Sequence, residues 1–138
     1  MIRNAVLQDA QVIHALTAEL GYSPSPETVS AQLEYLLNSD NQHVQLFEHR
    51  EQPAGWIQFG KTYRVGSEPF IEITGLVVSA RFRRLGIASA LVNQARGFAA
   101  AENLKLRVRC NSQRSEAHRF YQALGFAVNK QQKVFELS

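Results

Sequence analysis

The chain contains no long hydrophobic run, and it has a single cysteine, a single methionine and a single tryptophan. No apolar stretch approaches the roughly 18 residues that a membrane-spanning helix needs, so we expect no membrane partner. The first residues, Met1 to Asn4, lack the charged-then-apolar layout of a signal peptide. Cys110 has no second cysteine with which to form an internal disulfide. Together these absences predict a cytoplasmic protein.

Metal-ligand patterns are also missing. The histidines are scattered, and no Cys-x-x-Cys or His-Glu-x-x-His occurs. We therefore expect no metal, and interpret each histidine as a surface or packing residue. The four are His14, His43, His49 and His118.

What is present is the material of one folded domain. The 138 residues are 45% hydrophobic and 20% charged, a composition that excludes intrinsic disorder as the default state. No internal repeat or linker appears, so we predict a single domain over residues 1–138.

The net charge of +3 hides an asymmetry along the chain. Residues 1–72 carry four basic and nine acidic side chains, and residues 73–138 carry eleven basic and three acidic ones. The first part suits a cationic ligand and the second an anionic one, because local charge steers a partner. Ordinary solvated surface charge is the simpler alternative.

Hydrophobic periodicity in the first half predicts a strand at residues 2–6 and two helices. The first helix has Asp9 as N-cap and ends at Gly21, and the second has Ser25 as cap and Pro26 in its first turn. Alternating residues then predict a hairpin of strands 44–49 and 56–63 joined by a turn at 51–55. A further strand follows at residues 70–78.

The second half alternates between helix and strand. We expect helices at 85–101 and 115–124, the second closed by Gly125, and strands at 104–110, 126–128 and 134–137. This order predicts an α/β (α+β) fold, a mixed sheet with helices on both faces.

The segment Arg83-Arg84-Leu85-Gly86-Ile87-Ala88 opens the helix predicted at 85–101. A helix start leaves backbone N–H groups without partners and carries partial positive charge, and small residues let a phosphate approach. The segment is neither a Walker loop nor the three-glycine dinucleotide fingerprint. Taken alone it is compatible with a phosphate site or with a plain turn.

Two blocks of residues resemble a known family. Arg83-x-x-Gly86-x-Ala88 resembles the Gln/Arg-x-x-Gly-x-Gly/Ala signature of the GNAT superfamily, the Gcn5-related N-acetyltransferases. Asn111, Arg114, Ala117 and Phe120-Tyr121-x-x-Leu124-Gly125-Phe126 resemble the family's later motif. Ala88 is a variant that the signature allows, and Arg84 stands where many members have Gly.

The resemblance implies the GNAT fold and its cofactor. That fold is a mixed sheet of six to seven strands, splayed between strands 4 and 5, with about four helices on its two faces and acetyl-CoA in the split. Asn111 resembles the asparagine that binds the cofactor arm, although it could instead cap the helix that follows. The other cofactor-binding residues that the resemblance implies are Leu76, Val77, Val78, Arg83, Arg84, Leu85, Gly86, Ile87, Ala88 and Ser89.

Glu72 is the leading candidate for the general base, because it lies between apolar neighbours eleven residues before Arg83. The resemblance implies a glutamate base at this spacing in the histone acetyltransferase branch. A glutamate on a solvated strand face, with water removing the proton, is the alternative.

Tyr121 is the candidate general acid, since the resemblance implies a tyrosine near the cofactor sulfur at this position. Its apolar helical neighbours also fit a plain core aromatic. Cys110 could carry an acyl group, but it shares a strand face with Leu106 and Val108, which favours a small core residue.

The sequence thus predicts an acetyl-CoA-dependent N-acetyltransferase that works by direct attack in a ternary complex. Two alternatives are a catalytically silent acyl-CoA sensor and, less favoured, a basic nucleic-acid-binding domain. The acceptor is a small-molecule or protein amine, and a homodimer is left open because many relatives pair. The candidate acceptor-groove residues are Tyr22, Glu27, Glu34, Tyr35 and Trp56.

Overall fold

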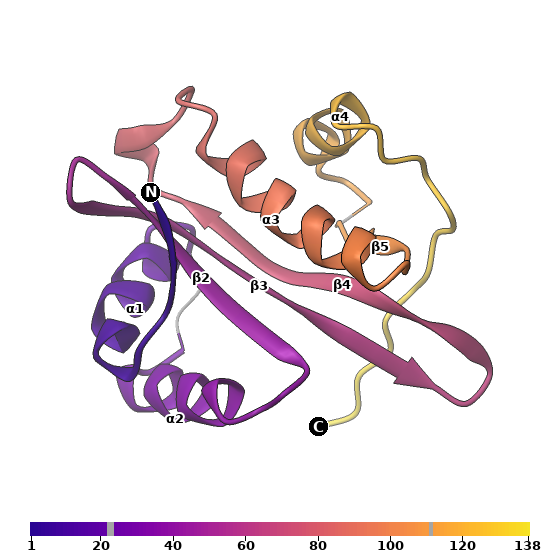
Figure 1. Cartoon of the computed structure of the whole chain (residues 1–138), viewed down its shortest axis with the longest axis horizontal. Helices are drawn as coiled ribbons and strands as arrows, with labels where there is room; N and C mark the ends of the chain where they lie inside the picture. Colours follow the sequence, from indigo (N-terminus) through magenta and orange to yellow (C-terminus); the bar gives the residue numbers. More distant parts are fainter. Residues whose placement is uncertain (22–23, 111) are drawn as a thin grey trace. The chain divides into compact units, whose positions relative to one another are not determined.

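A computed structural model describes residues 1–21, 24–110 and 112–138, which form two compact units. Among these described residues, the N-terminal unit, Met1–Val108, contains all the strands, and the C-terminal unit, Arg109–Ser138, contains one helix. We describe each unit by itself (Figure 1). The helices are α1 (Ala10–Ala18), α2 (Pro26–Leu37), α3 (Ile87–Ala101) and α4 (Ser115–Ala123), with short 3₁₀ helices η1 (Leu7–Asp9) and η2 (Ala80–Phe82).

The N-terminal unit is built on one sheet with its strands in sequence order. Its first four strands pair antiparallel, and β4 pairs parallel with β5 after the crossover through α3. The mixed sheet is confirmed, with five strands among the described residues where six to seven were predicted. The strands are β1 (Ile2–Asn4), β2 (Gln42–His49), β3 (Gln52–Arg64), β4 (Ser67–Val78) and β5 (Leu106–Val108).

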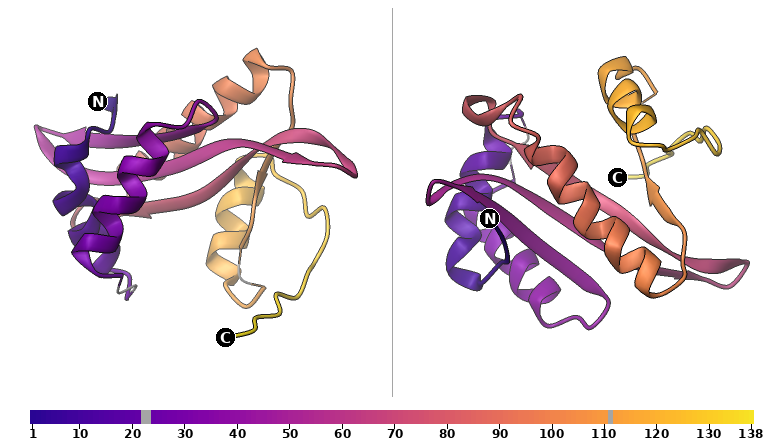
Figure 2. Two further views of the ribbon diagram at one scale, coloured as in Figure 1. Left: turned by 90° about the horizontal axis from the view of Figure 1, so that it is seen from below. Right: turned by 45° about the horizontal axis from the view of Figure 1, so that its top comes forward.

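Helices cover both faces of this sheet, as predicted. In the left view of Figure 2, α1 and α2 lie on one side of the sheet and α3 on the other. Val44 and Leu46 of β2 belong to the core cluster beneath α1 and α2. Phe59 of β3 is fully buried on the opposite face, with its ring centroid 5.1 Å from that of Phe98 in α3.

The β2–β3 connection is tighter than predicted. Arg50 and Glu51 both adopt left-handed backbone conformations (φ 51° and 66°), as two-residue hairpin turns require. Strand β3 then begins at Gln52, so the predicted turn at 51–55 is wrong. Pro53 is tolerated inside the strand because it stands opposite a register shift between Phe47 and Glu48.

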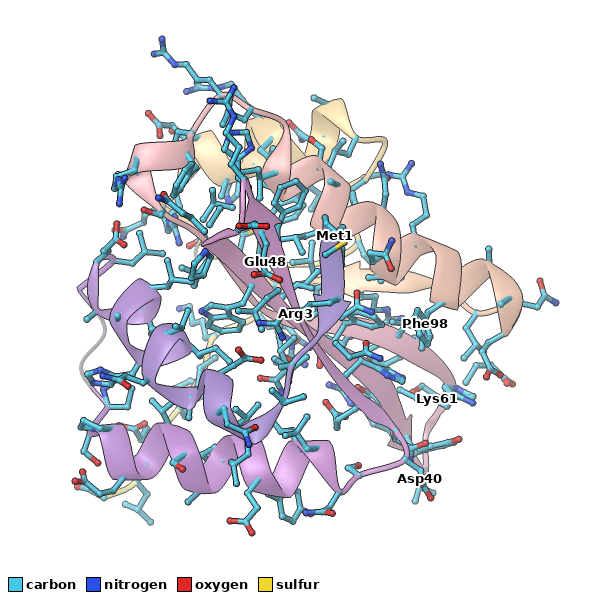
Figure 3. The ribbon with its side chains drawn as sticks, turned by 60° about the vertical axis from the view of Figure 1, so that its left-hand side comes forward. Met1, Arg3, Asp40, Glu48, Lys61 and Phe98 are labelled. Carbon is cyan, nitrogen blue, oxygen red and sulfur yellow. The ribbon has the colours of Figure 1, made fainter. Side chains whose placement is uncertain are left out.

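Asp9 was predicted to cap α1, and its carboxylate has another role. It accepts the Val6 N–H at 2.8 Å at the start of η1, and it binds both terminal nitrogens of Arg3 at 2.8 Å. Arg3 also donates its Nε–H to Glu48 of β2 at 2.7 Å (Figure 3). The hydrogen bonds from Arg3 lower the pKa of Asp9, although burial opposes them. This network fixes the N-terminal strand to the sheet.

In the C-terminal unit, α4 ends where predicted, and Gly125 follows with φ 99°. The strands predicted at 126–128 and 134–137 are not present, since these residues form no regular secondary structure. A strand needs a hydrogen-bonded neighbour, and residues 112–138 contain no second strand with which to pair. The strand predicted at 104–110 is likewise reduced to β5, at 106–108.

Candidate functional site

Strand β4 has two halves with different surroundings. Ile71, Glu72 and Ile73 pair with β5 on one side and with β3 on the other. From Thr74 to Val78 the described part of the chain gives β4 a partner only in β3. The sheet therefore opens along this second half of β4, between its fourth and fifth strands.

The hydrogen-bond pattern shows which groups of β4 face the opening. The Ser79 N–H donates to the Ala54 carbonyl at 2.8 Å, which makes these two residues a hydrogen-bonded pair. Hydrogen-bonded and non-hydrogen-bonded pairs alternate along antiparallel strands, so the backbone N–H and C=O groups of Val77 also hydrogen-bond to β3. The N–H and C=O groups of Leu76 and Val78 consequently point toward the open edge. Of the three predicted strand residues, these two have backbone groups at the open edge.

A β-bulge lies where β4 leaves β5. Gln58 stands opposite Gly75 and Phe59 opposite Ile73, so Thr74 is the extra residue. Glycine is required at 75, because a Cβ there would lie 2.6 Å from the Trp56 ring. Sequence reasoning missed this bulge, although a glycine within a strand is its usual signal.

Trp56 joins the bulge to α1. Its indole N–H donates to the Thr17 hydroxyl at 3.2 Å, while its ring lies against Gly75. The side chain is half-buried and packs against the core cluster beneath α1 and α2. This candidate acceptor-groove residue is therefore firmly positioned beside the open half of β4.

The loop after β4 leads to the start of α3. The first helical bond runs from the Ala90 N–H to the Gly86 carbonyl at 3.0 Å, so the N–H groups of Ile87, Ala88 and Ser89 precede any intrahelical acceptor. Gly86 is the N-cap, in a left-handed conformation (φ 75°), and no side chain caps the helix. This arrangement leaves N–H groups and partial positive charge available to an anion.

Three exposed residues precede Gly86, and two of them are positively charged. Arg83, Arg84 and Leu85 are all exposed. Arg84 has a left-handed backbone (φ 65°), a conformation that favours glycine over residues with a Cβ. The two guanidinium groups therefore stand in solvent directly before the uncapped helix.

The middle of the same loop contacts the β2–β3 hairpin. The ring of Phe82 makes an edge contact with His49, with centroids 5.6 Å apart, and the Arg81 guanidinium lies 5.3 Å from the Phe82 centroid. These residues, with Arg50, Gln52 and Leu85, line an open cavity of about 350 Å³. The loop is thus held on the β3 side, away from the open edge of β4.

Glu72 lies on β4 beside its pairing with β5, where it is half-buried and in register with Arg107. Its neighbours Ile71 and Ile73 pair with Lys61 and Phe59, which are on the α3 face. Glu72 therefore projects to the face of α1 and α2. The Arg107 guanidinium lies 4.2 Å from the ring centroid of Phe70, which shares the face of Glu72.

In the C-terminal unit, Tyr121 lies in a cluster of rings. Its centroid is 5.0 Å from that of Phe120 and 5.5 Å from that of Phe126, both at edge-to-face angles. Burial, with a smaller contribution from Cys110, raises the pKa of Tyr121 to about 12, although Arg114 opposes the shift. The phenol therefore remains protonated at neutral pH. Burial also raises the pKa of the Cys110 thiol, which disfavours a thiolate nucleophile.

The remaining candidates are placed as follows. Asn111 and Tyr22 lie outside the described residues. Glu27 and Glu34 are exposed on α2, and the side chain of Tyr35 is 73% exposed on the same helix.

Among the residues that the structure describes, no three His, Cys, Asp or Glu side chains gather as a metal site. In the same residues, no helix combines the length and the apolar character that crossing a bilayer requires.

Several solved structures share this fold. An apo aminoglycoside 6'-N-acetyltransferase, AAC(6')-IG from Acinetobacter haemolyticus, is 20% identical with a TM-score of 0.85 over 100% of this chain and 98% of its own. A transcriptional regulator from Bacillus halodurans is 23% identical with a TM-score of 0.86 over 99% of each chain. AAC(6')-Iy, solved with a bisubstrate analogue of CoA and acetylneamine, is 17% identical with a TM-score of 0.86 over 100% of this chain and 97% of its own.

Sequence comparison identifies the family. No curated protein matches the chain significantly. A sequence model of the acetyltransferase (GNAT) family matches residues 9–126, which span most of the chain and include both motif blocks. The chain belongs to the acetyltransferase (GNAT) family.

Proposed function

We propose that this protein is an acetyl-CoA-dependent N-acetyltransferase that acts on an amine by direct attack in a ternary complex. One observation carries the proposal: the open half of β4 leads, through a single loop, to an uncapped helix start with two exposed arginines. An extended arm can pair with the free strand edge, and a diphosphate suits the helix start.

The residues of the N-terminal unit fit acetyl-CoA in these two places. Leu76 and Val78 would bond the pantetheine arm through backbone groups. Ile87, Ala88 and Ser89 would donate N–H groups to the diphosphate, and Arg83 and Arg84 would add charge-assisted bonds. When bound, acetyl-CoA supplies the acetyl group as a thioester. The Leu76 N–H is then the group that polarises a carbonyl oxygen at the strand edge.

Glu72 is the proposed acceptor of the amine proton. It precedes Leu76 by four residues, but the bulge at Thr74 places the two opposite Gly60 and Ile57 of β3, which are three strand residues or roughly 10 Å apart. A glutamate side chain covers only part of that distance, so we propose that water relays the proton to Glu72. Arg107 stands in register with Glu72 on β5, and its guanidinium lies over the Phe70 ring on the same face.

Tyr121 is the proposed proton donor to the departing thiolate. The phenol is protonated at neutral pH, which is the state in which a general acid begins, although burial raises its pKa to about 12 and so weakens it as a donor. Asn111 is proposed to bind the cofactor arm, on the family motif alone.

We propose a small-molecule amine as the acceptor, since two of the similar structures are aminoglycoside acetyltransferases. The excess of acidic residues in positions 1–72 supports a cationic acceptor. A protein amine is the alternative that a substrate panel separates.

The decisive experiment measures free-thiol release from acetyl-CoA with a panel of aminoglycosides, polyamines and lysine peptides. We expect amine-dependent release, with Glu72→Gln and Tyr121→Phe lowering kcat while CoA affinity is retained. Glu68→Gln on the same strand and Tyr63→Phe on the exposed hairpin are matched controls. CoA binding without turnover on any amine would instead favour an acyl-CoA sensor.

A further inference from the structure

The loop that approaches α3 is anchored at its first residues by a side chain from α1. Glu19 is the C-cap residue of α1. Its Oε1 accepts the Ser79 hydroxyl at 3.1 Å and the Ala80 N–H at 3.4 Å. A single carboxylate oxygen thus binds two consecutive residues at the point where β4 ends.

Besides its bond to Glu19, Ser79 makes hydrogen bonds to β3 and to Arg81. Its side chain is almost completely buried, and its own N–H is bonded to Ala54 of β3. Its Oγ also accepts the Arg81 N–H at 3.4 Å, as the N-cap of η2. Because the Ser79 hydroxyl donates its hydrogen to Glu19, its lone pairs remain available to accept the Arg81 N–H. The Glu19 carboxylate therefore fixes the direction of the Ser79–Arg81 hydrogen bond. The conformation of residues 79–81 therefore depends on Glu19.

We propose that Glu19 is a positioning residue for cofactor binding, which holds the start of the 79–86 loop so that Arg83 and the α3 N-terminus are presented together. The inference rests on the function proposed above. It assigns no contact between Glu19 and either substrate. Because Glu19 precedes Gly21 by two residues, the contact also joins the end of α1 to the cofactor loop.

Substitutions of Glu19 distinguish a positioning role, which needs a side-chain oxygen, from a role that needs the negative charge. Glu19→Gln keeps a side-chain oxygen that accepts from Ser79 and Ala80, whereas Glu19→Ala removes it. Glu19→Ala and Ser79→Ala should each weaken CoA binding by roughly three- to tenfold, the effect of losing one or two modest hydrogen bonds. The double variant should lose less affinity than the two single effects added together, because both substitutions remove the Ser79–Glu19 bond, while only Glu19→Ala removes the Ala80 bond and only Ser79→Ala removes the Arg81 bond.

The experiment measures the Kd of CoA by calorimetry, KM and kcat for acetyl-CoA, and amide hydrogen exchange of Ala80 and Arg81. We expect Glu19→Ala to raise Kd and KM with little change in kcat, and to speed exchange at both amides. Glu19→Gln should restore all of these values to near the wild-type level. Glu68→Ala, which removes one exposed carboxylate from β4, is the charge-matched control.

Two results would overturn the inference while leaving the proposed function intact. One is an unchanged CoA affinity in Glu19→Ala when wild-type protein binds CoA. The other is a Glu19→Gln variant as impaired as Glu19→Ala with the defect confined to the KM of the amine, which would mean that the charge binds the acceptor. Wild-type protein that fails to bind CoA would contradict the proposed function, and the exchange rates would still test the anchor. If Glu19→Ala does not fold, Ser79→Ala and Glu19→Gln supply the same comparison.

Discussion

The helical segments of the N-terminal unit begin in two different ways. The Ser25 hydroxyl accepts the Thr28 N–H at 3.1 Å at the start of α2, and the Asp9 carboxylate accepts the Val6 N–H at the start of η1. Helix α3 begins at Gly86, which has no side chain with which to cap it. The first two starts are closed by the protein's own oxygens, and the third is open.

The capped starts and the open start should affect different quantities, the stability of the protein and its affinity for a ligand. A side-chain cap satisfies orphan N–H groups in the folded protein, so its contribution appears in the free energy of unfolding. An open start leaves the same groups to an external anion, so its contribution appears in ligand affinity. Substitutions at the closed starts should therefore change stability, and substitutions at the open start should change CoA binding.

The largest effect is expected at Asp9. Asp9→Asn replaces a carboxylate that holds Arg3 bidentately, and hydrogen bonds to charged groups are each worth roughly 1.5–3 kcal/mol. We expect a loss of about 2 kcal/mol in the free energy of unfolding at pH 7, measured by urea denaturation. CoA affinity should not change. Asp40→Asn, at an exposed position, is the control.

The same variant makes a prediction about pH. The pKa of Asp9 is lowered in the folded protein, so its contribution is fully present above its unfolded pKa of roughly 3.9. That contribution is lost as the pH falls through the lower, folded value. Wild type and Asp9→Asn should therefore differ at pH 7 and converge as the pH falls below the unfolded pKa and through the lower, folded one. A difference that persists unchanged at low pH would contradict the assigned ion pair.

Gly86→Ala is expected to have the next largest effect. A left-handed residue with a Cβ costs about 1–2 kcal/mol, although nothing lies within 4 Å of the added atom. Because Gly86 is exposed, the free loop can relax, and the cost appears when CoA is bound. We expect CoA affinity to fall about tenfold, since 1.4 kcal/mol corresponds to that factor.

Gly97→Ala is the matched control for this substitution. Gly97 lies within α3, has an ordinary backbone, and also has open space around it. Alanine there should stabilise the helix by about 0.5–1 kcal/mol and leave CoA binding unchanged. Equal losses of affinity in both variants would show that the left-handed start of α3 has no special part in binding.

The starts of α2 and α3 also show what the sequence could predict. Ser25-Pro26 acts through its own backbone and immediate neighbours, so local pattern was sufficient to place the start of α2. Helix α3 begins at Ile87, after the left-handed Gly86, two residues later than predicted. Asp9 was placed at a helix start, but its partners Arg3 and Glu48 depend on the pairing of β1 with β2. The bond from Ser79 to Glu19 likewise joins distant segments. Contacts of this kind have no local signal.

Ser25→Ala tests the start of α2, which a side chain caps. Loss of the cap should cost about 1 kcal/mol of unfolding free energy. In a domain of this size that corresponds to a fall of about 3 °C in Tm, measured by calorimetry. Ser25→Asp, which can still accept from Thr28, should restore stability. A change of CoA affinity in Ser25→Ala would contradict the prediction that capped helix starts affect only stability.

Arg83→Ala gives the smallest expected effect and tests the charge at the open start. Arg83 is exposed, so its attraction to a diphosphate acts through water, and such pairs contribute roughly 0.2–1 kcal/mol. We expect CoA to bind roughly 1.4- to fivefold more weakly at low ionic strength, a range that follows from that energy. The difference should shrink in high salt, because screening weakens exposed charge pairs. Lys130→Ala, at an exposed position in the C-terminal unit, controls for net charge. If both variants lose affinity equally, the basic second half attracts the cofactor through its overall field, and the loop arginine has no specific contact with it.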